Sequence, residues 1–383
     1  MISNGISKLD LKRRNRSQIL RLLRRRGPTS RIDIAREIGI TKAAITIITN
    51  EMIAEGILYE KGEQRSPDVP VSRGRKKILL DICSTYKMDL GIVLEKNQIH
   101  AGVATLWGEI VEKQSVPIAP SASREEILTQ LEKIYQQLFY KNGLSPEQVT
   151  GLGVCVDPIY FNRLEIDEKE YPQAEKFRER LSRFVQAPIA FARLSEAAAM
   201  AEMEYWQREQ PAPTDNLLLF RCCGKMDGAV VIEQELYRGS HGRVMQLPEI
   251  QMARTEEFFW DRLSSEFSET GTPVAWNLAQ GSPQRMKAMV RDGVMPMEDE
   301  PFRRIAEGFA AQRASDIRCA AGFLDPSLVI LLAAAEQEFW LRDALEAALE
   351  GLPVSRSRIQ PDALFLAGAA LATREFFCNT GGY

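Results

Sequence analysis

The residues best suited to chemistry in this sequence are groups that bind nucleic-acid phosphates and bases. Four of them stand at the start of a segment with helical periodicity: Thr41, Lys42, Ala43 and Thr46. Hydroxyl and ammonium groups there can reach phosphates or base edges, and small side chains let a helix backbone approach the major groove. A second group follows further along the chain: Arg73, Gly74 and Arg75. Arginines on a glycine-containing loop suit a narrow minor groove, where negative potential is concentrated.

Three predicted helices position these residues. Residues 9–26 form an amphipathic helix that Gly27 and Pro28 end. A short second helix spans Arg31–Ile38, and Gly39 follows it as a residue able to take a positive φ. Thr41 caps a third helix that runs to about residue 55. Two short helices joined by a tight glycine-containing turn are typical of a helix-turn-helix.

The third helix has a predicted core face and a predicted outer face. The apolar side chains fall on one side: Ile45, Ile48 and Met52. We expect Thr49 and Asn50 to lie mostly away from them. Residues 57–59 and 77–80 are predicted as the two strands of a wing, with the arginines at its tip.

Charge separates the beginning of the chain from the rest. Residues 1–80 hold 18 Lys and Arg against 8 Asp and Glu, a balance of +10, whereas the remainder holds 31 against 44. A basic head on an acidic body indicates that the head meets a polyanion. A winged helix that contacts only proteins is the alternative, but charge, helix spacing and wing arginines together favour double-stranded DNA.

Composition excludes several classes of protein. The chain of 383 residues is 45% hydrophobic and 26% charged, which is typical of a globular protein with a large core. Its apolar runs are much shorter than the roughly 20 residues of a membrane span. The first 17 residues lack the apolar segment of a secretory signal, so we expect none. The six cysteines lack metal-ligand or disulfide spacing. We therefore predict a cytoplasmic protein without membrane insertion, with a head at 1–82 and a body at 83–383.

The body is predicted to be α/β. Alternating strands flank the turn at residues 95–98, and a further strand begins near 109. A helix at 123–140 and a strand at 149–156 follow, and residues 216–220 and 228–236 are predicted as another pair of strands. Helical stretches occupy about 255–268, 300–322 and 338–350. Strands followed by helices, twice over, favour duplicated subdomains.

Six short motifs follow one another through the body. They are residues 91–93 (GIV), 151–154 (GLGV), 195–202 (SEAAAMAE), 238–242 (RGSHG), 324–330 (LDPSLVI) and 366–372 (LAGAALA). In this order behind a winged helix, they resemble the ROK proteins, which include sugar-responsive repressors and sugar kinases. Residues 73–80 are similar to the wing of the N-acetylglucosamine and xylose repressors. The resemblance implies a two-lobed, actin-like (ribonuclease-H-like) ATPase fold around a sugar cleft.

Departures from that family's kinases are informative. The first phosphate loop would need glycines where Val93–Lys96 stand, the second keeps only two glycines in 222–228, and alanines replace a third cluster at 333–335. Each added side chain obstructs the close approach of backbone to a nucleotide. Leu194 occupies the place of the catalytic aspartate and cannot accept a proton. We therefore expect no cofactor and no catalytic residue.

The metal and sugar sites of the family are altered as well. Glu249 stands where the zinc-region histidine would be, and the cysteine run is missing, so we expect no metal. The candidate ligand-binding residues are Asp157, Arg193, Gln246 and Glu249. Because a guanidinium can bind a carboxylate through two bonds, an acidic sugar derivative is a candidate effector beside a sugar. The alternative is a body that binds no ligand and serves only for dimerisation.

Together these features predict a sequence-specific DNA-binding transcriptional regulator. We expect a repressor of carbohydrate-related genes that binds a palindromic operator as a homodimer or homotetramer. Control by a protein partner instead of a small molecule is the alternative. A sugar kinase with a fused head is the third reading, which the missing base and glycine loops disfavour.

Overall fold

The structure is a computed structural model, and it describes residues 8–63, 77–95, 97–167, 171, 173–206, 214–221, 227–240, 300–332 and 339–383. The chain divides into two compact units. The first consists of Met1–Pro213 with Asp362–Tyr383, and the second of Thr214–Pro361. The predicted boundary at residue 82 falls inside the first unit.

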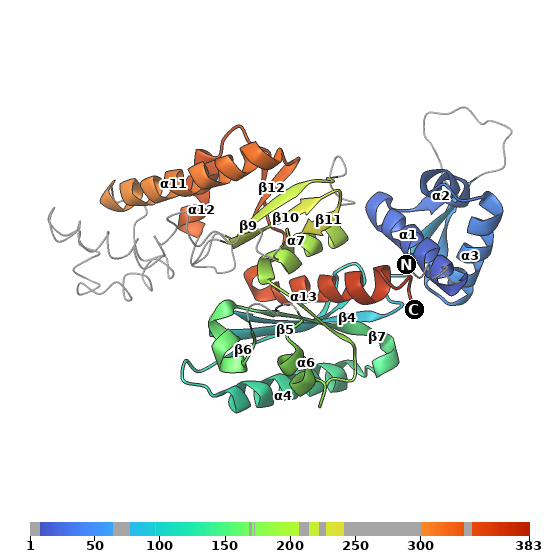
Figure 1. Ribbon diagram of the computed structural model, residues 1–383, viewed down its shortest axis with the longest axis horizontal. Helices are drawn as coiled ribbons and strands as arrows, with labels where there is room; N and C mark the ends of the chain where they lie inside the picture. Colours follow the sequence, from blue (N-terminus) through green and yellow to red (C-terminus); the bar gives the residue numbers. More distant parts are fainter. Residues whose placement is uncertain are drawn as a thin grey trace, which may run out of the picture. The chain divides into compact units, whose positions relative to one another are not determined.

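The head of the first unit is a winged helix (Figure 1). Its elements follow in the order α1 (Lys8–Arg26), β1 (Thr29–Ser30), α2 (Arg31–Ile38), α3 (Lys42–Ala54), β2 (Leu58–Glu63) and β3 (Ile78–Ile82). Ser30 accepts a hydrogen bond from the Asp33 amide at the start of α2, and Gly39 ends that helix at φ 74°. The three strands pair antiparallel in the order β1-β3-β2. The predicted helices and wing strands are thus present.

The rest of the first unit is a five-stranded sheet in the order β6-β5-β4-β7-β8. In chain order its strands are β4 (Met88–Glu95), β5 (Gln98–Thr105), β6 (Ile110–Pro117), β7 (Val149–Val156) and β8 (Ile189–Ala192). The first three pair antiparallel, while β4, β7 and β8 pair parallel. This mixed order puts the carboxyl ends of β4, β7 and β8 at one edge of the sheet.

Helices cover both faces of this sheet (Figure 1). On one face, α4 (Arg124–Asn142) and α6 (Glu175–Leu181) share a buried core with the strands. On the other, α13 (Phe365–Ala372) lies on β4 and β7, with α7 (Leu194–Tyr205) packed against it. The shorter elements are η1 (Pro146–Gln148), η2 (Pro158–Tyr160), α5 (Phe161–Leu164) and the π-helix η6 (Thr373–Cys378), which continues α13.

Glycines let the backbone of α13 rest directly on the strands. A β-carbon on Gly153 would lie 1.9 Å from the carbonyl oxygen of Gly368, and one on Gly91 would lie 1.9 Å from that of Phe365. No side chain fits at such distances. Three of the sequence motifs therefore meet at one helix–sheet contact, and their glycines are packing residues.

The second unit holds a sheet in the order β11-β10-β9-β12-β13. Its elements are β9 (Leu217–Arg221), β10 (Asp227–Ile232), β11 (Glu235–Tyr237), α11 (Glu300–Leu324), β12 (Leu328–Leu332), α12 (Phe339–Ala348) and β13 (Val354–Arg356), and η5 (Pro361–Ala363) follows them. The prediction of one strand over 228–236 is wrong. Glu233 and Gln234, at φ 51° and 67°, form the turn of a hairpin between β10 and β11.

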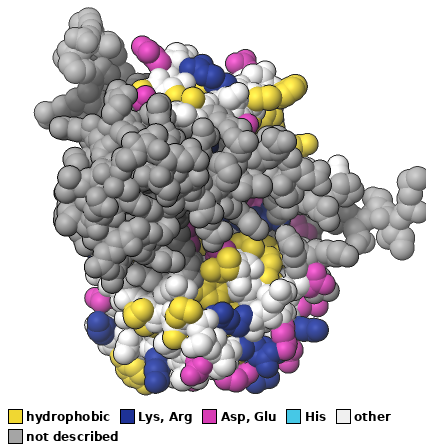
Figure 2. All heavy atoms as spheres, turned by 90° about the vertical axis from the view of Figure 1, so that its left-hand side faces the viewer, with side chains coloured by type: hydrophobic (Ala, Val, Ile, Leu, Met, Phe, Trp, Pro, Cys, Tyr) yellow, Lys and Arg dark blue, Asp and Glu magenta, His cyan; other side chains and the backbone are white. Residues whose placement is uncertain are grey.

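Further features bear on the sequence predictions. No helix in the described ranges is both long and apolar enough to cross a membrane. The predicted helix at 255–268 lies outside the described residues. Figure 2 shows basic and acidic side chains side by side on the lower part of the molecule.

The glycine contact predicts a large penalty for a single methyl group. Gly153→Ala should destabilise the protein by at least about 2 kcal/mol, because neither backbone can move aside without disturbing the sheet. Urea unfolding followed by circular dichroism measures this. Gly308→Ala in α11 is the control, because nothing lies within 4 Å of its β-carbon position. Equal stability of the two variants would contradict the packing described.

Candidate nucleic-acid interface

The first turns of α3 present the predicted DNA-binding residues. Thr41, Lys42 and Ala43 are exposed. Thr41 begins the helix by accepting a hydrogen bond from the Ala44 amide at 3.3 Å. Thr46 is half-buried and donates from Oγ1 to the Lys42 carbonyl at 2.8 Å. The α3 surface thus offers an ammonium, two hydroxyls and a methyl group from one end of a helix.

Ile47 is a further candidate contact that the sequence prediction missed. Its side chain is 62% exposed, although isoleucine is ordinarily a core residue. Ala43, Ile47 and Asn50 are exposed at helical spacing, which places them on one face of α3. Methyl groups on such a face can contact the thymine methyl in the major groove. The spacing of 43, 47 and 50 was the available signal.

Thr49 lies in the core, contrary to the prediction that it faces outward. It is fully buried, donates to the Ile45 carbonyl at 2.8 Å, and accepts from Arg31 Nε at 3.1 Å. Arg31 also donates to Asn50 Oδ1 and Glu60 Oε1, at 3.0 and 3.1 Å. This arginine therefore ties α2 to both α3 and the first wing strand.

The base of the wing is held to the helices. Lys77 pairs with Asp33 of α2 at 3.0 Å, just before β3 begins. Within the wing, β2 and β3 pair over five residue positions with a bulge between Glu60 and Gly62. Arg73, Gly74 and Arg75 lie outside the described residues.

The core of the winged helix continues into the body. The cluster around α1 and α3 includes Leu106, which follows β5, and Phe377 and Cys378 of η6. Trp107 and Tyr86 pack against the same cluster. Head and sheet therefore share buried apolar surface.

A buried ionic cluster lies at this junction. Arg24 of α1 donates from Nε to Glu204 Oε2 at 2.5 Å, and Arg374 donates to Glu204 Oε1 at 2.9 Å. The Arg24 guanidinium also donates to the Leu106 carbonyl at 2.8 Å and lies 4.6 Å from the centre of the Trp107 ring. All three charged residues are at most 8% exposed.

The charges of this cluster support one another. Burial is the largest influence on Arg24 and by itself lowers its pKa, but Glu204, together with the nearby Cys378, Tyr205 and Asp89, outweighs it, so the pKa is raised. Burial raises the pKa of Glu204, but Arg24 and Arg374 outweigh it, so the pKa is lowered. Glu204 is therefore held ionised between the two guanidinium groups.

Asp89 lies close to this cluster. Its two carboxylate oxygens accept hydrogen bonds from the hydroxyls of Thr150 and Thr373. Complete burial is the largest influence and raises the pKa of Asp89 to about 7, although both hydroxyls and the Arg24 charge act against it. The Asp89 carboxyl group therefore gains or loses its proton near neutral pH.

Two candidate ligand residues lie at the same edge of the sheet. In the parallel pair β7 and β8, Cys155 is opposite Ala192. Asp157 and Arg193 follow the carboxyl ends of these strands, where ligands bind in open α/β sheets. Gln246 and Glu249 lie outside the described residues.

Each of the two has a local partner. Asp157 accepts a hydrogen bond from the Ile159 amide at 3.0 Å. Arg193 forms an ion pair with Glu196 at 3.6 Å, on the first turn of α7. Glu196 and Glu202, both on α7, are 8% and 6% exposed and thus buried. Leu194, in the position of the kinase base, is 4% exposed.

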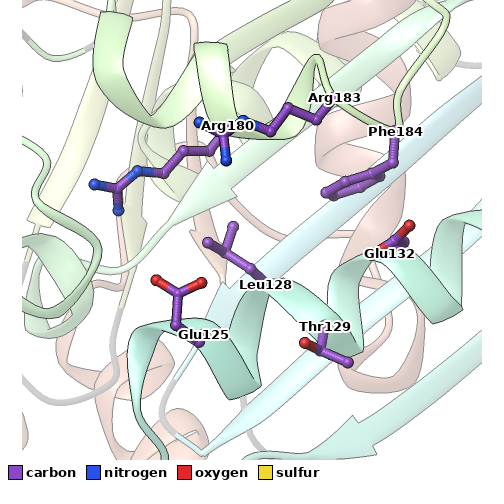
Figure 3. Close-up of a pocket in the computed structure, with 7 residues that line it drawn as sticks. All are labelled: Glu125, Leu128, Thr129, Glu132, Arg180, Arg183 and Phe184. Atoms are coloured by element: carbon purple, nitrogen blue, oxygen red, sulfur yellow. The ribbon is translucent and has the colours of Figure 1, made fainter.

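A cavity on the opposite face of the sheet is separate from these residues (Figure 3). It has a volume of about 350 Å³. Its walls come from α4 and from α6 with the residues that follow it: Glu125, Leu128, Thr129, Glu132, Arg180, Arg183 and Phe184. Across the described ranges, no group of three or more His, Cys, Asp or Glu is placed to hold a metal ion.

Comparisons with known proteins agree that the head is a winged helix-turn-helix. Residues 12–59 match a family model described as winged helix-turn-helix DNA-binding. The chain is 25% identical over 238 residues to a putative xylose repressor of Caldicellulosiruptor sp. (strain Rt8B.4), covering 61% of this chain and 57% of that protein. It is 22% identical over 246 residues to the xylose repressor of Bacillus subtilis (strain 168), covering 61% and 59%. The chain thus spans less than two thirds of the length of these relatives.

Solved structures show the fold of the whole chain. A ROK family transcriptional regulator, a homologue of the E. coli MLC protein, superposes with a TM-score of 0.72 at 18% identity, covering 97% of this chain and 98% of that one. A ROK family glucokinase from Streptomyces griseus superposes with a TM-score of 0.56 at 16% identity, covering 75% and 99%. The expected winged helix followed by a ROK-type α/β body is confirmed, as is the resemblance to ROK regulators.

The buried carboxyl group predicts a pH-dependent stability. Between the usual pKa of 3.8 and about 7, folded protein keeps a proton on Asp89 that unfolded protein has released. Stability should therefore fall as pH rises through this window, by about 2–4 kcal/mol, and level off above it. Asp89→Asn removes this contribution. The free energy of unfolding of the variant, relative to that of the wild type, should therefore rise from pH 4 to pH 8. Denaturant unfolding across that range measures the difference, and parallel pH profiles would contradict it.

Proposed function

We propose that the protein is a DNA-binding transcriptional regulator and acts as a repressor of carbohydrate-related genes. The observation that carries this is the exposed start of α3, with Thr41, Lys42 and Ala43 on a winged helix that matches a DNA-binding family model. The basic balance of residues 1–80 supports a polyanionic partner. The names of the relatives, xylose repressors, support the link to sugar genes.

We assign no catalysis to the body. Leu194 is a buried hydrocarbon at the position of the kinase base, and a hydrocarbon cannot accept a proton. Val93 and Glu95, in place of loop glycines, are buried at the end of β4. A side chain at either position obstructs the close approach of a phosphate to the backbone. A kinase-type nucleotide site is therefore not supported by this chain's residues.

The assembly on DNA is a homodimer or homotetramer in this proposal. A two-fold axis in the body would present two α3 helices to a palindromic operator, with half-sites one or more helical turns apart. The wing would add Arg73 and Arg75 in the adjacent minor groove. A regulator of this kind would act in the cytoplasm, where it meets its DNA.

DNA binding by this head should depend on salt in a residue-specific way. Lys42→Ala, Arg73→Ala and Arg75→Ala should each weaken binding and reduce the slope of log K against log salt by about one, since each removes one positive charge that displaces a counterion from the DNA. Fluorescence anisotropy with labelled duplex DNA at several salt concentrations measures this. Lys133→Ala, an exposed lysine on α4, is the matched control and should leave the slope unchanged. If the wild-type protein bound no duplex at low salt, the proposed function would be wrong.

The ligand at the carboxyl edge of the sheet is proposed to be a sugar or an acidic sugar derivative. Arg193 is 13% exposed and its guanidinium already pairs with a carboxylate, that of Glu196. A guanidinium has five N–H donors in a planar fork, so Arg193 can bind an incoming carboxylate beside Glu196.

A thermal-shift panel of sugars, sugar acids and sugar phosphates tests the effector. At about 100 times its dissociation constant, a ligand of the folded state adds about 2.7 kcal/mol of stability. An acidic hit should lose its shift in Arg193→Ala and keep it in Arg183→Ala, an exposed arginine on the other face of the sheet. A shift that survives Arg193→Ala excludes the guanidinium from the site. No shift at all favours control by a protein partner.

A further inference from the structure

The contacts of Arg24 join the DNA-binding head to three backbone and side-chain groups of the body. Its guanidinium donates to Glu204 Oε2 at 2.5 Å, to the Glu204 carbonyl at 3.1 Å and to the Leu106 carbonyl at 2.8 Å. Glu204 belongs to α7, and Leu106 follows β5. One side chain of α1 is therefore fixed both to α7 and to the residue that follows β5.

Such a cluster restricts geometry more than it adds stability. A buried ion pair gains little over well-packed apolar side chains, because removing charges from water is costly. A planar guanidinium with a carboxylate and two carbonyls around it nevertheless allows only one orientation. Arg374 holds the second oxygen of Glu204 at 2.9 Å, so the carboxylate cannot rotate to follow a moving Arg24.

A second attachment on α1 prevents rotation about the first. Arg16, two turns earlier on the helix, donates from Nε to the Gly381 carbonyl at 2.8 Å. Its guanidinium lies 4.1 Å from the centre of the Tyr383 ring. The two arginines are about 12 Å apart along the helix axis at 1.5 Å per residue. Two points fix the direction of α1 on the body.

The direction of α1 in turn fixes α3. Leu20 and Leu23 of α1 lie in the same buried cluster as Ile45 and Met52 of α3. Close-packed cores move as rigid bodies. The recognition helix therefore cannot turn relative to the sheet while Arg24 keeps its contacts.

We propose that Arg24, held by Glu204, is a positioning residue for DNA recognition that sets the relative placement of two recognition helices on a palindromic site. The proposal rests on the proposed function and deepens it. The two residues touch no DNA in this scheme; they act through α1 and α3. Fixed heads engage both half-sites at once with a high effective concentration, whereas loosened heads do so with a lower one.

The test compares a whole site with half of it. The probes are a duplex with the full inverted repeat and a duplex with one half-site, both taken from the consensus that the wild-type chain selects. For Glu204→Gln we expect the affinity ratio between full site and half-site to fall about tenfold, with half-site affinity unchanged within about twofold. A merely structural loss would lower both affinities together.

Two further variants make the result decisive. Arg24→Lys keeps a positive charge but loses the forked geometry, so its ratio should fall as well, even if Glu204→Gln does not fold. Asp81→Asn is the matched control, because the buried Asp81 pairs with Lys61 at 3.4 Å and both residues belong to the wing strands of the head. It should lower stability and leave the ratio unchanged.

The outcomes separate the two proposals. No binding of either duplex by the wild-type protein refutes the proposed function. Binding with a wild-type ratio near one, or a ratio that survives both Glu204→Gln and Arg24→Lys, overturns the positioning role alone. A fall in the ratio for Asp81→Asn equal to that for Glu204→Gln also overturns it, because head stability would then be the cause.

Discussion

The structure depends on a buried arginine that is neutralised across the border between two parts of the chain. Arg24 brings a charge from α1 into a buried site, where Glu204, the Leu106 carbonyl and the Trp107 ring surround it. Removing one partner of such a pair leaves a buried charge uncompensated, which costs about 3–5 kcal/mol. The head is consequently packed firmly onto the body. The direction in which its proposed DNA-binding surface faces therefore depends on the sheet.

One helix, α7, connects the proposed ligand residue with the contact between body and head. Arg193 precedes α7 at the carboxyl edge of the sheet, and Glu204 lies near its other end. Behind α7, α13 rests on Gly91 and Gly153 without intervening side chains, so α7 packs on a support that yields little. A ligand with different affinities for two positions of α7 would shift the head between two directions. The geometry thus offers a physical route from ligand to DNA.

The sequence predicted those parts of the fold that local signals specify. The bounds of α2 were signalled by a cap at Thr29 or Ser30 and by Gly39, and in the structure Ser30 and Gly39 cap the helix. Arg24 gave no such signal, because it stands in a run of three arginines and its partner is 180 residues away. Likewise, Thr49 reads as a polar outer residue until Arg31 is placed beside it. Tertiary contacts between residues far apart in the sequence decided both cases.

Selection of binding sites from random duplex DNA by the full chain tests the central claim most directly. If the winged helix reads DNA from a fixed position on a symmetric body, sequencing should recover one inverted repeat whose half-sites have a single spacing. Each half-site should contain the base pairs that α3 contacts. Recovery of no motif, or of half-sites at many different spacings, would contradict the account.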